Sequence, residues 1–231
     1  MKKLFRFILK TILWFVLLSV VWVFVHKYIP VYYTPLMAIQ NFKGNENFDL
    51  KHEWKSIDEI SSGIQLAVIC SEDQNFIKHN GFDVTAIKKA YKENLEGKKL
   101  KGASTISQQT AKNVFLWPQR SWLRKGFESW FTLLIETIWS KERILEVYLN
   151  SIEMGEGVFG VEAASKHWFN VSAKNLSRNQ SAAIAAILPN PTQFKASPAS
   201  NYISKRKRWI LLQMKNYGVF TLKENDESKS D

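Results

Sequence analysis

CSEDQNFIKHNGFD, residues 70–83, is the stretch that says most about how this chain folds. The residues before it have a helical, apolar pattern without Gly or Pro, and the stretch adds two adjacent carboxylates, Glu72 and Asp73. At about 100° per residue, Glu72, Phe76 and His79 share one helix face. A carboxylate that projects from an apolar helix into a cleft can act as a general base or acid. An exposed acidic turn explains the segment about equally well.

Helical periodicity extends from Ser61 to about Gly218, whereas strand-like alternation is nearly absent. Side chains that can cap a helix N-terminus precede the expected helices at Asp83, Thr105, Ser121, Ser140 and Ser177. The sequence therefore predicts a mainly α domain over residues 61–220. The polar tail, residues 221–231, has too few apolar residues to fold and is predicted to be disordered.

The first 28 residues are predicted to form a cytoplasmic tail and one transmembrane helix. Thr11 to Val25 carries no charge and, with the apolar residues before it, approaches the ~20 residues that span a bilayer. Basic residues are concentrated before this run, which places the N-terminus in the cytoplasm and the rest outside. A signal peptide has the same charge order, but no Ala-x-Ala-like cleavage site follows. Residues 29–60 mix Pro, Asn, Gly and charge, as in a juxtamembrane connector.

The composition limits the kinds of partner and cofactor. A formal net charge of +11 suits an anionic partner: nucleic acid, a membrane surface or a phosphorylated substrate. Nucleic acid is not expected, because no recognition motif is present. The single Cys excludes an intrachain disulfide, and the four His lack zinc-ligand spacing. The sequence has no P-loop for a nucleotide and no Asp-x-Asp for a metal-bound nucleotide sugar.

A second polar cluster lies in KGASTISQQTAKNVFL, residues 101–116. Small residues lead into a helix whose early turns carry Gln108, Gln109, Lys112 and Asn113. Two amides and an ammonium near a helix N-terminus can bind an anionic ligand that is rich in hydroxyl groups. The alternative is an amphipathic helix with an ordinary polar face, although such a face usually includes an acid to pair the cation.

A third cluster follows. Arg124 and Lys125 lie four and three residues before Glu128, the spacing of a surface salt bridge worth less than about 1 kcal/mol. The aromatic residues around Glu128 instead favour a second functional carboxylate held near cations. Arg120 is a further candidate from its charge and position alone. Lys141, in the next helix, is interpreted as an ordinary exposed charge.

Together, these clusters fit transfer from a lipid-linked pyrophosphate. Such a donor lies at the bilayer surface, is strongly anionic, and departs readily when cations meet its developing charge. This interpretation requires the carboxylate of Glu72 and the amines of Lys112 and Lys125 to share one cavity sized for two sugars.

Four motifs occur in the order seen in a known family. They are Glu72-Asp-x-x-Phe-x-x-His-x-Gly-x-Asp, Gly102-x-Ser-Thr-Ile-x-Gln-Gln-x-x-Lys-Asn, Arg124-Lys-x-x-Glu and Lys141-x-x-Ile-Leu-Glu-x-Tyr-Leu-Asn. Over about residues 61–193 the chain resembles the family 51 glycosyltransferases, which are the peptidoglycan glycosyltransferases of bacterial cell-wall synthesis. It looks like their monofunctional form from Gram-negative envelopes, because no transpeptidase half is present.

The resemblance implies a fold, an activity and a location. The fold is a mainly α, lysozyme-like glycosyltransferase domain beside a membrane anchor. The activity is polymerisation of lipid II into β-1,4-linked glycan strands with release of undecaprenyl pyrophosphate. The domain is expected on the periplasmic side of the bacterial inner membrane. Expected partners are lipid II, the lipid-linked growing strand and the membrane, with other cell-wall synthases and division proteins as further candidates.

The resemblance also implies roles for individual residues. Glu72 is expected to be the general base of an inverting displacement. Glu128 is expected to position the donor or to hold a divalent cation, Mg²⁺ or Mn²⁺, at its pyrophosphate; no organic cofactor is expected. Residues expected to bind or line the substrate are Ser104, Gln109, Lys112, Asn113, Arg124 and Lys125. Residues expected to support the base are Asp73, Phe76, His79 and Asp83.

Two other functions stay open at this point. A lysozyme-type hydrolase also uses a Glu on a helix of an α domain, but it has no need of the cationic cluster or of an anchor. A non-catalytic scaffold that binds lipid II or a division protein would keep its function when Glu72 is replaced by Gln.

Overall fold

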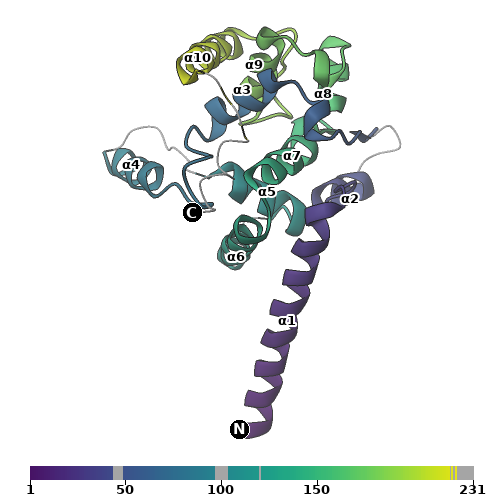
Figure 1. The fold of residues 1–231 in the computed structure, drawn as a ribbon, viewed down its shortest axis with the longest axis vertical. Coiled ribbons are helices and arrows are strands. Elements are labelled where there is room, and N and C mark those ends of the chain that lie inside the picture. The colour runs from purple at the N-terminus through teal and green to yellow at the C-terminus, as the bar shows by residue number, and fades with distance from the viewer. Residues whose placement is uncertain (44–48, 97–103, 120, 219, 221, 223–231) are drawn as a thin grey trace, which may run out of the picture.

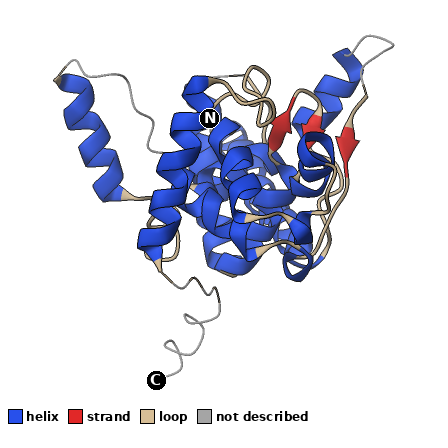
Figure 2. Ribbon diagram, turned by 90° about the horizontal axis from the view of Figure 1, so that it is seen from above, coloured by secondary structure: helices blue, strands red, loops and turns tan. Residues whose placement is uncertain are grey.

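The structure is a computed structural model that describes residues 1–231 except 44–48, 97–103, 120, 219, 221 and 223–231. Its helices are α1 (Lys2–Tyr28), α2 (Pro35–Lys43), α3 (Ser62–Glu72), α4 (Val84–Leu95), α5 (Ile106–Phe115), α6 (Trp122–Ile138), α7 (Lys141–Ser151), α8 (Val161–Phe169), α9 (Arg178–Ile187) and α10 (Asn201–Tyr217). Three short strands, β1 (Lys51–His52), β2 (Glu153–Gly155) and β3 (Val158–Phe159), form one small sheet at the edge of the domain (Figure 2). The predicted mainly α class is confirmed. The predicted tail lies outside the described residues except for Leu222.

The core of the domain forms around α7, whose Ile144, Leu145, Tyr148 and Leu149 are fully buried. Helices α5, α6 and α8 pack against α7. In the upper part of Figure 1, α3, α9 and α10 form a second packed group. The many alanines of α9 allow α3 and α10 to approach it closely. Each buried Leu or Ile contributes roughly 1.5–3 kcal/mol, so this packing holds the ends of α3 and α5 in fixed positions.

Helix α1 extends away from the domain (Figure 1). It is long and apolar enough to cross a membrane, because its 27 residues span about 40 Å at 1.5 Å per residue. Its C-terminal half packs against α6. Trp130 Nε1 donates to Ser19 Oγ at 3.1 Å, and Trp139 Nε1 donates to the Val23 carbonyl at 2.8 Å. These bonds fix the direction in which the anchor leaves the domain.

The prediction that one helix carries Glu72, Phe76 and His79 is wrong, since α3 ends at Glu72. Asp73 leaves the helical conformation, with φ −160° and ψ 77°. Its carboxylate accepts hydrogen bonds from His79 and from the N–H of Ile106 at the start of α5, and these bonds compete with continuation of the helix. The segment therefore makes a helix end and a folded loop, in which Phe76 is fully buried.

The connector predicted at residues 29–60 packs on the domain. It contains α2 and β1, and β1 pairs in parallel with β3, which pairs antiparallel with β2. Gln40 Nε2 on α2 donates to both carboxylate oxygens of Glu153, at 3.1 and 3.2 Å. The sequence pattern missed this sheet, because strands of two or three residues are too short to show alternation.

The predicted helix caps are confirmed. In each, the side chain accepts a hydrogen bond from a backbone N–H in the first helical turn: Asp83 for α4, Thr105 for α5, Ser121 for α6, Ser140 for α7 and Ser177 for α9. Thr105 with Gln108 and Ser177 with Gln180 also form capping boxes. A cap of this kind contributes about 1 kcal/mol. The sequence therefore located the N-termini of the helices that position the site.

Gly160, at the start of α8, is expected not to tolerate a side chain. Its φ is +78°, and a Cβ built there lies 2.7 Å from the carbonyl oxygen of Asn150. We expect Gly160→Ala to lower the free energy of unfolding by about 2–3 kcal/mol, because strained backbone and a backbone clash each cost energy. Thermal unfolding in detergent measures this. Gly126→Ala is the matched control: its Cβ meets nothing within 4 Å on α6, so it should be neutral or stabilise by up to about 1 kcal/mol. Equal stabilities of the two variants would contradict the expectation.

Candidate active site

Glu72 stands at the C-terminal end of α3 with its side chain 15% exposed. Its Oε2 accepts a hydrogen bond from Gln109 Nε2 at 3.2 Å. Its Oε1 accepts one from Ser71 Oγ at 3.0 Å and lies 3.5 Å from Arg206 Nη2. The carboxylate lines a cavity of about 360 Å³, called here the Glu72 cavity. Its walls are Glu72, Asp73, Gln74, Asn75, Asp83, Thr85, Ala86, Lys89, Ser104 and Thr105.

The Gln109 amide is oriented by Tyr148 of α7. The Tyr148 hydroxyl donates to Gln109 Oε1 at 3.4 Å, which leaves Gln109 Nε2 to donate to Glu72. Burial, and after it the negative charges of Glu72 and Asp73, raise the pKa of Tyr148 well above its usual value. The phenol therefore stays protonated and keeps the amide in this orientation. The structure thus places Gln109 beside the candidate base.

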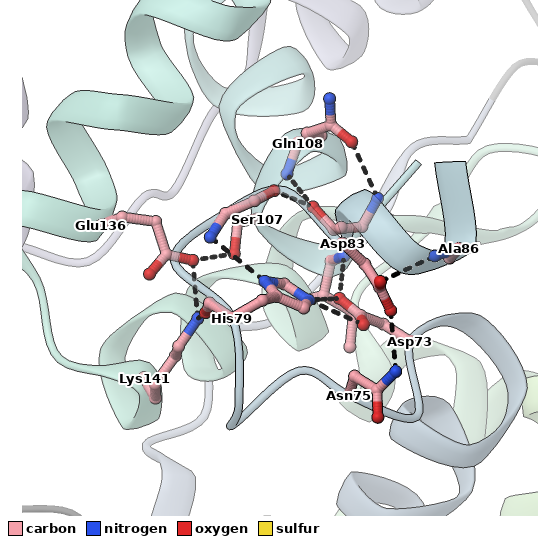
Figure 3. A network of polar contacts seen from close by, with 12 residues as sticks. Asp73, Asn75, His79, Asp83, Ala86, Ser107, Gln108, Glu136 and Lys141 are labelled. Atoms are coloured by element: carbon pink, nitrogen blue, oxygen red, sulfur yellow. Dashed lines mark hydrogen bonds and ion pairs between the residues drawn. The ribbon is translucent and has the colours of Figure 1, made fainter. Parts of the chain in front are cut away.

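Asp73 and His79 form a pair beside the start of α5 (Figure 3). His79 Nε2 lies 2.9 and 3.0 Å from the two carboxylate oxygens of Asp73. The N–H of Gly81 donates to His79 Nδ1 at 3.1 Å, so the ring proton is assigned to Nε2, which donates to Asp73. Asp73 also accepts from the N–H of Ile106 at 3.0 Å. This pair ties the loop after Glu72 to the helix that carries Gln109.

The prediction that Lys141 is an ordinary exposed charge is wrong. Its side chain is 17% exposed, and Nζ donates to the His79 carbonyl at 2.6 Å and to Glu136 Oε1 at 2.8 Å. Ser107 also donates to Glu136, whose side chain is 6% exposed, and Lys141 Nζ lies 4.7 Å from the centre of the Phe76 ring. The sequence did not show this burial, because the His79 carbonyl and the Phe76 ring belong to a segment more than 60 residues before Lys141, although Glu136 is close in sequence (Figure 3).

Asp83 joins the loop to α4. Its Oδ1 accepts from the Ala86 N–H and its Oδ2 from Asn75 Nδ2, both at 2.8 Å. The Ala86 bond, and next the Asn75 bond, hold the pKa of the Asp83 carboxyl below its usual value. Because the pKa is lowered in the folded state, the stabilisation is present above the unfolded value of about pH 4 and is lost as pH falls through the folded value.

Asp83→Ala should therefore lower the free energy of unfolding by about 1 kcal/mol at pH 7, the typical cost of losing an N-cap. The difference from the wild type should shrink below about pH 4, where the unfolded carboxyl is also protonated. Denaturant unfolding at several pH values measures both. Asp58→Ala, at an exposed position, is the control. A cost that stayed constant down to pH 3 would rule out this explanation.

Glu128, on α6, is buried at 4% exposure and paired with two cations. Lys125 Nζ donates to Glu128 Oε1, and Arg124 Nη1 lies 3.6 Å from Oε2. Arg124 also lines a second cavity of about 210 Å³, called here the Lys112 cavity. Its walls are Leu36, Lys112, Asn113, Leu116, Trp117, Pro118 and Arg124. This cavity combines basic and amide groups with apolar side chains from α2, α5 and the residues after α5.

Glu72 lines the Glu72 cavity, whereas Lys112 and Arg124 line the Lys112 cavity. The single cavity shared by Glu72, Lys112 and Lys125 that the sequence predicts stays a prediction. Helix α5 links the two cavities: Gln109 reaches Glu72, and Lys112, one turn later, lines the second cavity. Three residues advance a helix by about 4.5 Å. Ser104 lies on the wall of the Glu72 cavity. Arg120 lies outside the described residues, so its place at the site stays a prediction.

The described residues do not form a metal site. Within them, no group of three or more His, Cys, Asp or Glu side chains is placed to hold a metal ion. Glu128, the carboxylate expected to hold a divalent cation, is paired with Lys125 and Arg124. A divalent cation at this position would meet two like charges. The geometry therefore fits a carboxylate that holds basic side chains better than one that holds a metal.

Comparison with known proteins shows to which family this chain belongs. Residues 38–215 match the family described as Transglycosylase. The chain belongs to this family. It is 52% identical over 216 residues to a biosynthetic peptidoglycan transglycosylase of Bacteroides thetaiotaomicron, a match that covers 92% of this chain and 87% of that protein. A protein of the same name from Pseudomonas syringae pv. syringae is 49% identical over 221 residues and 94% of both chains. The resemblance drawn from the four motifs is confirmed.

Sequence reasoning missed three polar residues at the site of this transglycosylase: Ser71, Glu136 and Arg206. Arg206 lies in the basic run of α10, where composition does not separate inward from outward residues. Helical phase gives a signal, because Arg206 lies three residues after Ile203 and four before Ile210, both fully buried. Ser71 and Glu136 carry no comparable signal in the sequence.

Proposed function

We propose that this transglycosylase polymerises lipid II into β-1,4-linked glycan strands, with Glu72 as general base and undecaprenyl pyrophosphate as leaving group. The observation that carries the proposal is the position of Glu72: a mostly buried carboxylate on a cavity wall, oriented by Gln109, Ser71 and Arg206. Membership of the family and the names of its relatives support the substrate class.

In the proposed step, Glu72 takes the proton of the acceptor sugar's 4-hydroxyl while that oxygen attacks the anomeric carbon of the donor. The bond from this carbon to the pyrophosphate breaks on the opposite face, so an α-linked donor gives a β-glycoside. Glu72 ends the step protonated, and the pyrophosphate leaves with the electron pair. Base catalysis of this kind contributes about 10²–10⁴-fold.

The Lys112 cavity is proposed to bind the diphosphate. Nε and Nη1 of Arg124 are buried without a hydrogen-bond partner among the described residues, so phosphate oxygens would supply acceptors there. Lys112 and Asn113 line the same cavity, and Glu128 holds Arg124 and Lys125 in place. Cations that meet the charge developing on the leaving group lower the barrier. Apolar walls at Leu36, Leu116 and Trp117 suit the lipid attached to that diphosphate.

Helices α1 and α6 support the proposed location. The N-terminus is proposed to be cytoplasmic, because basic residues precede the apolar run, and the domain is proposed to be periplasmic at the inner membrane. Trp122 and Leu123, at the start of α6, are 93% and 67% exposed although they are apolar. Because α6 packs along α1, contact with lipid explains this exposure. The donor would then meet the Lys112 cavity without leaving the bilayer surface.

The test of the function uses the purified full chain in detergent with two substrates. Labelled lipid II should give long strands on a gel, and finished peptidoglycan should stay intact. Fragments from finished peptidoglycan, with no strands from lipid II, would instead support a lysozyme-type hydrolase. Binding of lipid II without either product would support a non-catalytic scaffold.

A further inference from the structure

We propose that Arg206 and Ser71 are positioning residues that hold the carboxylate of Glu72, the base, in its working orientation. The inference rests on the proposed function, since it concerns the base of that reaction. Arg206 lies on α10, 134 residues along the chain from Glu72. Helix α10 packs on α9 and α3, and this packing brings the guanidinium to the end of α3.

Arg206 and Ser71 contact each other, and both contact the same carboxylate oxygen of Glu72. Arg206 Nη2 donates to Ser71 Oγ at 3.0 Å and lies 3.5 Å from Glu72 Oε1. The Ser71 hydroxyl lies 3.0 Å from Glu72 Oε1 and 3.2 Å from the Ala185 carbonyl of α9. Because Arg206 donates to Ser71, the hydroxyl proton is free to point at Glu72 Oε1. With Gln109 bonded to Oε2, both carboxylate oxygens are located and the plane of the carboxylate is fixed.

Burial distinguishes Arg206 from the exposed Lys205 and Arg208 of the same helix, whereas Lys207 is also half-buried. The Arg206 side chain is 23% exposed. Arg206 Nε is buried and has no hydrogen-bond partner within the described part of the chain. A buried donor left unpaired is destabilising. The arrangement is thus not the one that stability alone would favour, which is typical of residues held at a functional site.

The charges around Glu72 come from several elements. Asp73 follows α3, Tyr148 lies on α7, and Asp83 and Lys89 stand on the walls of the Glu72 cavity before and within α4. Arg206 is the cation that lies within 4.0 Å of the Glu72 carboxylate among the described side chains. Without Arg206, less positive charge would compensate the negative charges of Asp73 and Asp83 near Glu72. Loss of Arg206 would also remove one of the contacts that locate Glu72 Oε1.

The variants separate charge from geometry. We expect Arg206→Gln to lower kcat about 10–100-fold, because displacing a catalytic group by about 1 Å can lower the reaction rate about 10²-fold. KM should stay within about twofold, because Arg206 contacts the base and not the substrate in this proposal. Arg206→Lys keeps the charge without the planar fork, so its kcat should fall less than that of Arg206→Gln. Ser71→Ala should lower kcat at nearly constant KM. Arg208→Gln, at an exposed position of the same helix, is the matched control and should behave as wild type.

The experiment measures initial rates over a range of labelled lipid II concentrations, together with the thermal stability of each full-length variant. A wild-type kcat for Arg206→Gln would overturn the inference, as would a rise in KM at constant kcat, which would make Arg206 a substrate-binding residue. If Arg206→Gln does not fold, Arg206→Lys and Ser71→Ala decide: lower kcat at constant KM in both supports positioning, and wild-type kcat in both overturns it. Glu72→Gln tests the proposed function separately. An active Glu72→Gln removes the base assignment itself, whereas an inactive one beside a wild-type Arg206→Gln removes only the role of Arg206.

Discussion

Glu72→Gln should lower the rate of glycan polymerisation by about 10²–10⁴-fold, the contribution of a general base. The amide is nearly the same size as the carboxylate and can still accept from Ser71 or Gln109, so the cavity should keep its shape. It cannot take up the proton of the acceptor hydroxyl. Gel analysis of labelled lipid II products measures the rate, and a lipid II binding assay should give nearly the wild-type affinity.

The control for this variant is Glu156→Gln, which changes a solvent-exposed Glu in the turn between β2 and β3. It should polymerise lipid II at the wild-type rate. Polymerisation by Glu72→Gln within a few-fold of wild type would show that another group takes the proton. Loss of lipid II binding together with activity would instead mean that Glu72 holds the substrate.

Lys141→Met should lower the free energy of unfolding by about 3–5 kcal/mol, the cost of removing one partner of a buried ion pair. The side chain of Glu136 is 6% exposed and would lose its cation, although Ser107 would still donate to it. The His79 carbonyl would lose a donor at 2.6 Å as well. Denaturant unfolding at pH 7 measures the change.

The controls for Lys141 separate loss of the pair from loss of a charge. Lys205→Met removes an exposed Lys from α10 and should change the free energy of unfolding by less than about 0.5 kcal/mol. Lys141→Met combined with Glu136→Gln should recover part of the loss, because no uncompensated charge remains. A double variant as unstable as the sum of the two single variants would show that the two side chains act independently.

The sequence located helices well where side chains act on their own helix. N-caps at Asp83, Thr105 and Ser140 could be recognised because the capping bond lies within one turn. The end of α3 could not be recognised, because the hydrogen bonds that end this helix join the Asp73 carboxylate to His79 and to the N–H of Ile106. Periodicity continues through such a point, since it reports burial and not hydrogen bonding.

At the site, the motifs located Glu72, Gln109 and the basic residues of α5 and α6, but not how they divide between two cavities. That division depends on how α3, α5 and α6 pack together. Arg206 was missed for the same reason, because its partner lies 134 residues away. Spacing along one helix predicts neighbours on that helix, whereas contacts between distant segments require the fold.

The most direct test of the base is a structure of the Glu72→Gln protein with lipid II bound as acceptor and a pyrophosphate-linked analogue bound as donor. The distance from the residue 72 amide to the acceptor 4-hydroxyl should be about 2.6–3.2 Å, within hydrogen-bond reach, and the diphosphate should lie against Lys112 and Arg124. A 4-hydroxyl beyond that reach from residue 72, beside a different carboxylate, would contradict the account.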